Sequence, residues 1–247
     1  MPLDSPATNL FPVLEAVSPA AHETGLRVLQ GYSLAPTDAG HVAVLLGMMA
    51  PALGDTVLDA GCGFGEVARL MRLQRPDLSF ILLNRVSAQM RHLPTGPGFL
   101  PVLGDMHAIP LAAGSVDGVM FSWALCHADH PAALAEAARV VKPGGFLFLY
   151  ELIRTGGENA LFEQHLHARA YPVAMLLAMC KAAGFALELF LAPTADDAQM
   201  RALMAHDLAL HDAIFSDLRP AVWKLVRKGT QANAAIPAPS HMEGPTP

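Results

Sequence analysis

Apolar residues follow two different spacings along the chain. Between residues 13 and 50 they recur at helical spacing, for example at Leu26, Leu29 and Val42, which predicts two or three helices. From Thr56 onward, short apolar runs alternate with amphipathic segments, which is the pattern of a parallel sheet flanked by helices. These runs predict strands at 56–60, 80–84, 99–103, 116–123, 146–152, 185–191 and 221–228, and the intervening segments predict helices at 66–75, 87–93, 131–141, 172–183 and 196–215.

Prolines and glycines mark several of these boundaries. Pro131 can occupy the first turn of a helix, and Pro143-Gly144-Gly145 is expected to end that helix and turn the chain into the next strand. The run 221–228 alternates well enough to predict an edge strand, although a helix stays open there. Residues 230–247 are rich in Pro, Ala and Gly, which predicts a disordered tail.

The sequence VLDAGCGFG at residues 57–65 takes a buried strand directly into a glycine-rich turn and then a helix. Glycines suit such a turn because the backbone bends sharply and a nucleoside-bearing ligand lies against it. A nicotinamide dehydrogenase places GxGxxG at the same point, but Glu66 stands where its third glycine would be. The loop therefore favours S-adenosylmethionine (SAM) over a nicotinamide cofactor.

Three further segments extend this pattern: GDM at 104–106, IPLAAGSVDGV at 109–119 and EAARVVKPGG at 136–145. Together with VLDAGCGFG they resemble, in order, the motifs of the class I SAM-dependent methyltransferases, over residues 56–191. The resemblance implies an α/β fold with a Rossmann-like, doubly wound, mostly parallel seven-stranded sheet and an N-terminal helical cap. The implied organisation is a cap at 1–50, a SAM-binding domain at 51–229 and the tail at 230–247.

The same resemblance implies a role for each residue of the SAM site. The three loop glycines would approach the methionine part of SAM, the first-strand aspartate would order the loop, and the GDM turn would hold the adenine. Backbone at the end of the fourth strand would line the methionine side. The alternative for each position is that the residue only ends a strand and has no contact with a ligand. The implied cofactor-binding residues are Asp59, Gly61, Gly63, Gly65, Asn84, Arg85, Asp105, Met106, Ser122 and Trp123.

Asn84 departs from the common form, in which Asp or Glu ends the second strand and binds the ribose. An amide can still bind a diol, but without the charge-assisted strength of a carboxylate. Residues 84–89, NRVSAQ, resemble the NxSxxQ variant of cyclopropane-fatty-acid synthases and of sterol, tocopherol and geranyl diphosphate C-methyltransferases. That resemblance favours a carbon acceptor, such as an alkene of an isoprenoid or prenyl diphosphate.

Two residues are candidates for the chemistry at the acceptor. Glu151, near the end of the fifth strand, would stabilise a carbocation and remove its proton if the acceptor is an alkene. His127 would act as a base for an oxygen or nitrogen nucleophile of a small secondary metabolite, or would only shape the cofactor pocket. Zinc binding by Cys126, His127 and His130 is a remote alternative, so no metal site is assigned.

Three more residues are predicted to bind the acceptor. Arg91 and Arg154, together with Arg85, could meet a diphosphate, with Mg²⁺ bound if the substrate carries one. Tyr32, in the N-terminal leader, could fold over the SAM pocket, or be an ordinary residue of a cap helix.

Composition and charge narrow the cellular setting and the partners. Of the 247 residues 53% are hydrophobic, yet no run reaches the roughly 18 apolar residues of a membrane span, and no signal peptide begins the chain. The net charge of −6 includes no basic block, so a small-molecule substrate is expected and nucleic acid is not. Three scattered cysteines suit a reducing, cytoplasmic compartment, and a homo-oligomer stays possible. A nicotinamide-dependent oxidoreductase and a non-catalytic SAM-binding protein are the alternatives.

Overall fold

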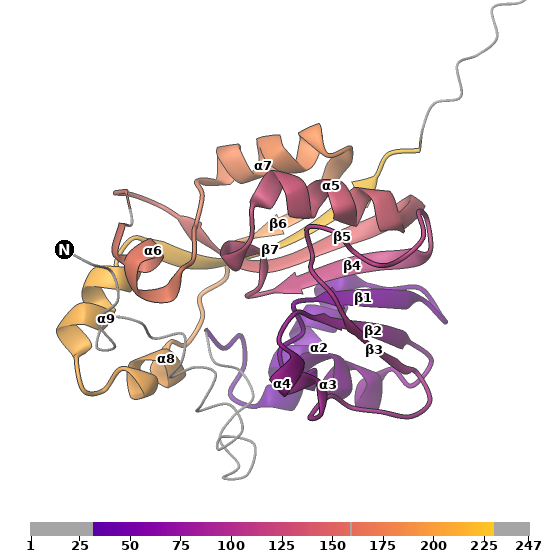
Figure 1. The fold of residues 1–247 in the computed structure, drawn as a ribbon. Coiled ribbons are helices and arrows are strands. Elements are labelled where there is room, and N and C mark those ends of the chain that lie inside the picture. Colours follow the sequence, from indigo (N-terminus) through magenta and orange to yellow (C-terminus); the bar gives the residue numbers. More distant parts are fainter. Residues whose placement is uncertain (1–31, 159, 230–247) are drawn as a thin grey trace, which may run out of the picture.

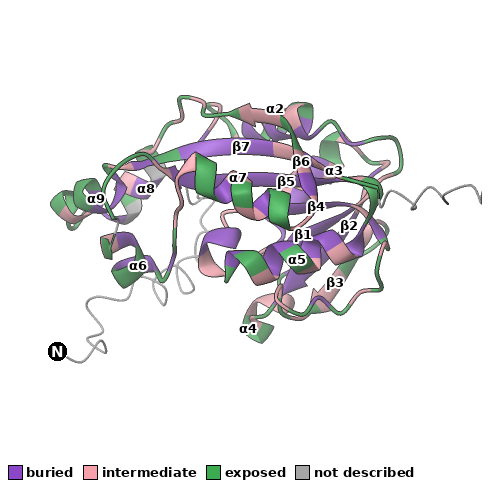
Figure 2. Cartoon of the chain, turned by 90° about the horizontal axis from the view of Figure 1, so that it is seen from above, coloured by how far each residue is buried: buried purple, intermediate pink, exposed green. Residues whose placement is uncertain are grey.

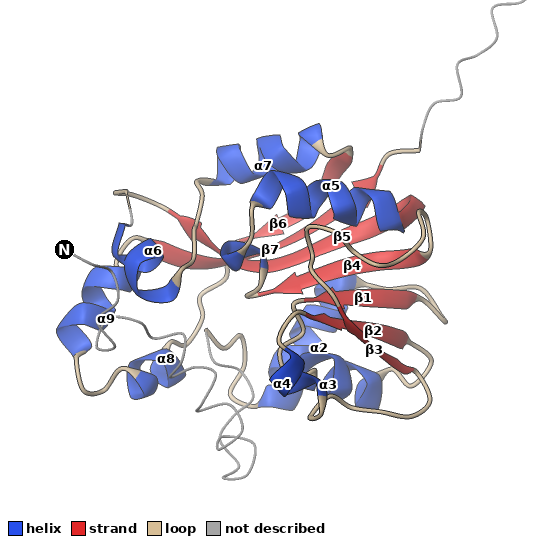
Figure 3. Ribbon diagram, viewed as in Figure 1, coloured by secondary structure: helices blue, strands red, loops and turns tan. Residues whose placement is uncertain are grey.

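The computed structural model describes residues 32–158 and 160–229, which form a helix-covered sheet (Figures 1 and 3). The sheet has seven strands in the order β3-β2-β1-β4-β5-β7-β6, and β7 runs in the opposite direction to the other six. The doubly wound, mostly parallel α/β sheet expected from the sequence is therefore confirmed. The strands are β1 Thr56–Ala60, β2 Ser79–Asn84, β3 Phe99–Leu103, β4 Val116–Ser122, β5 Val141–Arg154, β6 Phe185–Leu191 and β7 Leu218–Arg227.

The strand β7 corrects one expectation, because the run 221–228 was predicted to form an edge strand. It is a strand, but it lies inside the sheet, hydrogen-bonded to β5 on one side and β6 on the other. Its Trp223 is fully buried, whereas β6, the true edge, is half exposed along its length. An apolar run at the end of a chain indicates burial, but it does not say between which strands it inserts.

Helices cover both faces of the sheet (Figure 1). α2 Asp38–Met49 and α3 Glu66–Gln74 lie on one face, and α5 His130–Val140 and α7 Val173–Ala182 lie on the other. Two separate buried clusters follow from this arrangement, and Figure 2 shows the buried strands between the helices. The N-terminal cap was predicted at residues 1–50, of which residues 1–31 lie outside the described residues. The helix of the remaining part is α2, which packs on the sheet beside α3.

Three short helices gather at one end of the sheet: α6 Ala160–Leu166, α8 Ala198–Leu203 and α9 Leu208–Phe215 (Figure 1). Their apolar side chains form a third buried cluster together with Tyr32 and Leu152. The single helix predicted at 196–215 is thus two helices. The break has a local cause, because the Asp207 carboxylate accepts the Leu210 N–H and starts α9 as a new helix.

Two other boundaries differ from the sequence prediction. α4 Ser87–Met90 stops short of the predicted 93, and Pro94 follows, which cannot continue a helix. α5 ends at Val140 and β5 begins at once, so Pro143-Gly144-Gly145 lies within β5 as an irregularity in its pairing with β4. Gly144 there has a φ of 80°, which a glycine adopts without strain.

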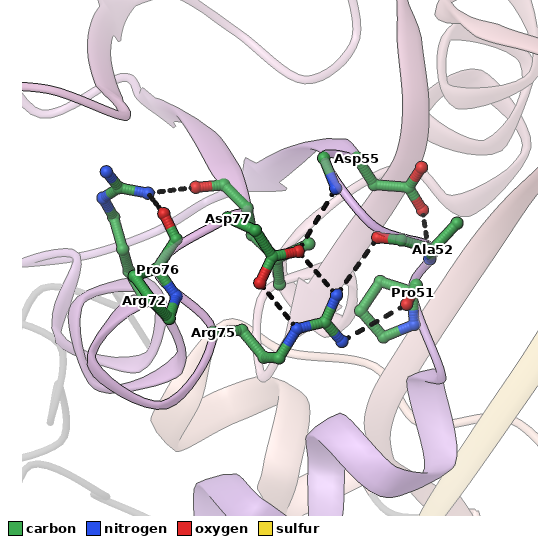
Figure 4. Close-up of polar contacts among 9 residues, drawn as sticks. Pro51, Ala52, Asp55, Arg72, Arg75, Pro76 and Asp77 are labelled. Atoms are coloured by element: carbon green, nitrogen blue, oxygen red, sulfur yellow. Dashed lines mark hydrogen bonds and ion pairs between the residues drawn. The ribbon is translucent and has the colours of Figure 1, made fainter.

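A polar cluster ties the amino ends of β1 and β2 together (Figure 4). The Arg75 guanidinium contacts the Asp77 carboxylate at 2.7 Å and also donates to the Ala52 carbonyl. Asp77 also accepts the Gly54 N–H. The hydrogen bond from the Arg75 guanidinium keeps the pKa of Asp77 well below its usual value. These contacts join the segment before β1 to the segment before β2 at the amino edge of the sheet.

Candidate active site

The direction of strand order reverses between β1 and β4, and in open α/β sheets ligands bind beside the carboxyl ends of the strands at such a point. A cavity of about 130 Å³ lies there. Its walls come from the turns that follow β1, β2, β3 and β4, four segments far apart in sequence. The lining residues are Gly61, Gly63, Leu83, Asn84, Arg85, Val86, Gln89, Gly104, Met106, Trp123, Ala124 and His127.

The three glycines after β1 all have positive φ values, but they face different surroundings. A Cβ on Gly61 would lie 2.6 Å from the Ala124 Cβ, and one on Gly65 would lie 2.7 Å from Pro94. These two glycines allow close packing of neighbouring segments. A Cβ on Gly63 would meet nothing within 4 Å, so this backbone faces open space in the cavity. Gly63 is the part of the loop where a ligand can lie against the main chain.

The side chain of Asn84 connects the first two turns of the site. Its Nδ2 donates to the Gly63 carbonyl and to Gln89 Oε1, each at 2.8 Å, and its Oδ1 accepts the Val86 N–H at 2.9 Å. The backbone partners fix the amide's orientation, because a carbonyl only accepts and an N–H only donates. Both Nδ2 hydrogens are used, so Asn84 has one acceptor lone pair left for a ligand. The Asn84–Gln89 pair therefore forms the part of the cavity wall where the turns after β1 and β2 meet.

The turn after β4 is strained and is held by a buried carboxylate. Trp123 lines the cavity with a φ of 57°, a conformation that a bulky residue adopts only where its surroundings enforce it. Directly after it, the Ala124 and Leu125 N–H groups both donate to Glu151 Oε1, at 2.8 and 2.7 Å. Glu151 is 3% exposed, and burial raises its pKa to about 7. Glu151 thus positions the turn that presents Trp123 to the cavity.

His127 ends the short 3₁₀ turn η1 Leu125–His127 and lines the same cavity. Burial lowers its pKa, so the imidazole is neutral at pH 7. Its Nδ1 lies 3.3 Å from the His167 carbonyl, which only accepts, so Nδ1 is the donor of this contact. A neutral imidazole beside a ligand cavity can accept a proton.

The turn after β3 is tied to the start of α5 by His107. Its Nδ1 lies 2.6 Å from Asp105 Oδ1, and its Nε2 accepts the Asp129 N–H at 2.9 Å. Hydrogen bonds from His107, first its backbone N–H, lower the pKa of Asp105. Asp129 caps α5 through the Ala132 N–H. His107 therefore couples the turn expected to bind adenine to the loop that carries His127, a link that the sequence analysis missed.

Several predicted site residues border the cavity without lining it. Asp59 is buried in β1, and burial raises its pKa to about 7. Gly65, Asp105 and Ser122 adjoin the cavity-lining turns, and Glu151 lies behind one of them. Their predicted roles stay predictions.

None of the three residues predicted to bind the acceptor lines the cavity. Arg91 donates to His92 Nε2 and Arg154 donates to the Gly157 carbonyl. Tyr32 is buried against Trp123 and lines a second cavity.

The sequence analysis did not single out five residues that line the cavity: Leu83, Val86, Gln89, Gly104 and Ala124. Gln89 carried a readable signal, because it closes the NxSxxQ pattern with Asn84. Residues 32–158 and 160–229 place no group of three or more His, Cys, Asp or Glu side chains where they could hold a metal ion. Over the same ranges, none of the helices has the length and apolar character needed to cross a membrane.

Comparison with known proteins identifies the domain. Residues 58–149 match the family model described as a methyltransferase domain. Over 132 residues the chain is 33% identical to the malonyl-[acyl-carrier protein] O-methyltransferase of Serratia marcescens, which covers 47% of this chain and 46% of that protein. Residues 58–149 are therefore similar in sequence to a methyltransferase domain. The chain is also 36% identical, over 126 residues, to an uncharacterized protein in transposon TN4556 of Streptomyces fradiae, and that match covers 48% of this chain and 36% of that protein. The chain thus matches less than half the length of either relative.

Solved structures show the same fold. Geranyl diphosphate C-methyltransferase from Streptomyces coelicolor A3(2), in complex with Mg²⁺, geranyl diphosphate and S-adenosyl-L-homocysteine, superposes with a TM-score of 0.66 at 15% identity, covering 76% of this chain and 77% of that one. The [4+2]-cyclase SpnF superposes with a TM-score of 0.70 at 16% identity, covering 88% and 94%. The Rossmann-like methyltransferase fold is thus confirmed, and it is shared by enzymes of different named chemistry.

Proposed function

We propose that this protein transfers a methyl group from SAM to an oxygen or nitrogen atom of a small molecule. The observation that carries the proposal is the open backbone at Gly63, at the strand-order reversal of a domain that matches the methyltransferase family. A nicotinamide enzyme is disfavoured, because Glu66 begins α3 where that fingerprint needs a third glycine.

The residues around the cavity fit the parts of SAM. Gly63 would adjoin the methionine portion, the remaining lone pair of Asn84 would accept from a ribose hydroxyl, and Met106 would pack on the adenine ring. Arg85 also lines the cavity. When bound, SAM supplies an electrophilic methyl group to an aligned nucleophile. The protein's own contribution is alignment, exclusion of water and acceptance of a proton.

The choice of a heteroatom acceptor rests on the different settings of the two catalytic candidates. His127 lines the cavity and is neutral, so it can take the proton that an O–H or N–H acceptor loses. Glu151 is buried behind the cavity wall, with Oε1 committed to two backbone N–H groups. The motif that contains Asn84 and Gln89 resembles one found in carbon-methylating enzymes. In this structure the two side chains hydrogen-bond to each other, and Asn84 also joins the turns after β1 and β2, so the pair does not indicate the acceptor.

A second candidate, C-methylation of an alkene in an isoprenoid or prenyl diphosphate, is favoured by one observation. Glu151 Oε2 is buried without a hydrogen-bond partner, so this carboxylate retains an unused oxygen. In that reaction Glu151 would stabilise the cation and remove its proton. Arg85, which lines the cavity, would then meet a diphosphate together with Mg²⁺, whereas Arg91 and Arg154 do not line the cavity.

The deciding experiment measures SAM turnover against a panel of phenols, amines, fatty acids and isoprenoid diphosphates. On the acceptor that turns over, we expect His127→Gln to lower kcat by roughly 10²-fold and Glu151→Gln to stay within a few-fold of wild type, both at unchanged SAM affinity. The glutamine oxygen can keep the hydrogen bonds from the Ala124 and Leu125 N–H groups, while the variant removes the ionisable carboxyl group. The reverse pattern would establish the carbon mechanism, and failure to bind SAM in calorimetry would refute both.

A further inference from the structure

The part of the chain between β5 and α7 packs against the turn that carries His127. It consists of α6 and the loop that follows it up to Tyr171, which together form the α6 segment. At its end the segment returns to the sheet, because the Arg154 N–H in β5 donates to the Tyr171 carbonyl at 3.1 Å. At its start, Phe162 and Leu166 are buried in the third cluster, where α6 lies beside α9 (Figure 1). The α6 segment is therefore anchored at both ends.

The loop of the α6 segment makes two direct contacts with η1. The Arg169 N–H donates to the Cys126 carbonyl at 2.7 Å, and His127 Nδ1 donates to the His167 carbonyl at 3.3 Å. The Cys126 side chain is buried in the same cluster as Leu166. The loop thus contacts both the backbone of η1 and the ring of its last residue.

His167 adopts an unusual backbone conformation at this contact. Its φ is 48°, in the left-handed region that residues with a Cβ disfavour. Its N–H donates to the Glu163 carbonyl at 3.0 Å, the bond that ends a helix with a left-handed residue, a position usually held by glycine or asparagine. The His167 side chain is exposed, so its own packing does not impose this conformation. The unusual turn and the contact with His127 coincide at one residue, and such coincidences are frequent at functional sites.

The same contact acts on the protonation of His127. Burial lowers the pKa of His127, and the positive charges of Arg85 and of the His167 imidazole lower it further. The hydrogen bonds that the His167 and Leu166 carbonyls accept from the ring act in the opposite direction. A protonated imidazole has two N–H donors, so a carbonyl that already faces the ring stabilises the cation formed when the ring takes a proton.

We propose that His167 is a positioning residue of the methyl-transfer site: its left-handed turn directs a backbone carbonyl at His127 and holds the imidazole ready to take the acceptor's proton. The inference rests on the proposed function, since it concerns the base of that reaction. In the reaction the acceptor's oxygen or nitrogen bonds to the methyl carbon, the bond from sulfur to methyl breaks to leave neutral S-adenosyl-L-homocysteine, and the proton passes to His127. The carbonyl carries the role of His167, so the position requires a residue that tolerates left-handed backbone.

The test compares His167→Val with His167→Asn in the full-length protein. Both variants remove the imidazole, but asparagine adopts the left-handed conformation readily and a β-branched residue does not. NMR of the histidine ring C–H signals gives the pKa of His127 in the ligand-free protein, and His127→Gln assigns the signal. We expect the pKa of His127 to be lower in the valine variant by about 0.5 or more, because the ring loses a carbonyl that favours its protonated form.

Turnover supplies the second readout. On the acceptor that turns over, kcat should be about tenfold lower in His167→Val than in His167→Asn, at equal SAM affinity. Ala50→Val is the matched control, because Ala50 ends α2 with a φ of 43°, is exposed and does not line the cavity. It should change neither the pKa of His127 nor kcat. His167→Thr, which is also β-branched, provides the same comparison if the valine variant does not fold.

The outcomes separate this inference from the proposed function. Equal pKa values of His127 in the two His167 variants, a pKa difference without a difference in kcat, or an equal loss of kcat in Ala50→Val would each overturn the positioning role. The NMR comparison needs no acceptor, and methyl transfer by the wild-type protein alongside any of those results leaves the proposed function standing. Wild-type turnover by His127→Gln would instead refute the proposed base, whatever the NMR comparison shows.

Discussion

At the scale of single residues, the same residue type serves different purposes within one short loop. Gly61 and Gly65 are required by neighbours that come within 3 Å of an added Cβ, whereas Gly63 has free space. The sequence shows only three alternating glycines, so the sequence analysis predicted the same contact with the ligand for all of them. The distinction depends on Ala124 and Pro94, which come from other turns, so sequence reasoning could not draw it.

Gly63→Val tests the free space directly. We expect SAM binding to be lost in calorimetry, because a branched side chain would enter the cavity where the ligand meets the backbone. Gly54→Val is the matched control, since Gly54 also has a positive φ and open surroundings but lies at the opposite edge of the sheet. Both variants should lose about 1–2 kcal/mol of stability from backbone strain. Unaltered SAM affinity in Gly63→Val would contradict the site.

At the scale of elements, the sequence predicted the strands that carry the site better than the segments around them. Strand-end positions such as Asn84 and Trp123 could be placed, because the motifs fix where each buried run stops and parallel strands end at one edge. The insertion of β7 between β5 and β6, and the split of 196–215 into α8 and α9, depend on contacts that no local pattern encodes. The second cavity, which Tyr32 lines together with residues of α8, α9 and β7, is built from those very segments, and for that reason sequence reasoning missed it.

The coupling of two elements through His107 gives a prediction at this scale. His107→Ala removes the bridge from Asp105 to the Asp129 N–H, so the turn after β3 and the start of α5 lose their mutual support. We expect SAM affinity to fall by about 1 kcal/mol, or five- to tenfold, the range for losing a neutral hydrogen bond. His206→Ala, at an exposed position in the turn between α8 and α9, should leave the affinity unchanged. Equal dissociation constants for the two variants would exclude the bridging role.

At the scale of the whole molecule, two carboxyl groups are buried in the sheet next to the candidate site. Burial raises the pKa of Asp59 from 3.8 to about 7 and that of Glu151 from 4.5 to about 7. Each group therefore holds a proton in the folded state at a pH where the unfolded chain has released it. The unfolded state then binds fewer protons than the folded state, so the free energy of unfolding decreases as pH rises.

This linkage predicts a pH-dependent stability with a defined window. The contribution of the two carboxyl groups is fully present below about pH 4, declines as pH rises from there through 7 and is then lost, with each group contributing at most about 4 kcal/mol. Burial lowers the pKa of His127 and His130, which works in the opposite direction below pH 6.5, so variants must isolate the carboxyl effect. Urea unfolding of the ligand-free protein between pH 5 and 8 should show a smaller decline in Asp59→Asn and in Glu151→Gln than in wild type. Parallel pH curves for all three proteins would mean that both carboxyl groups are ionised in the folded state across this range.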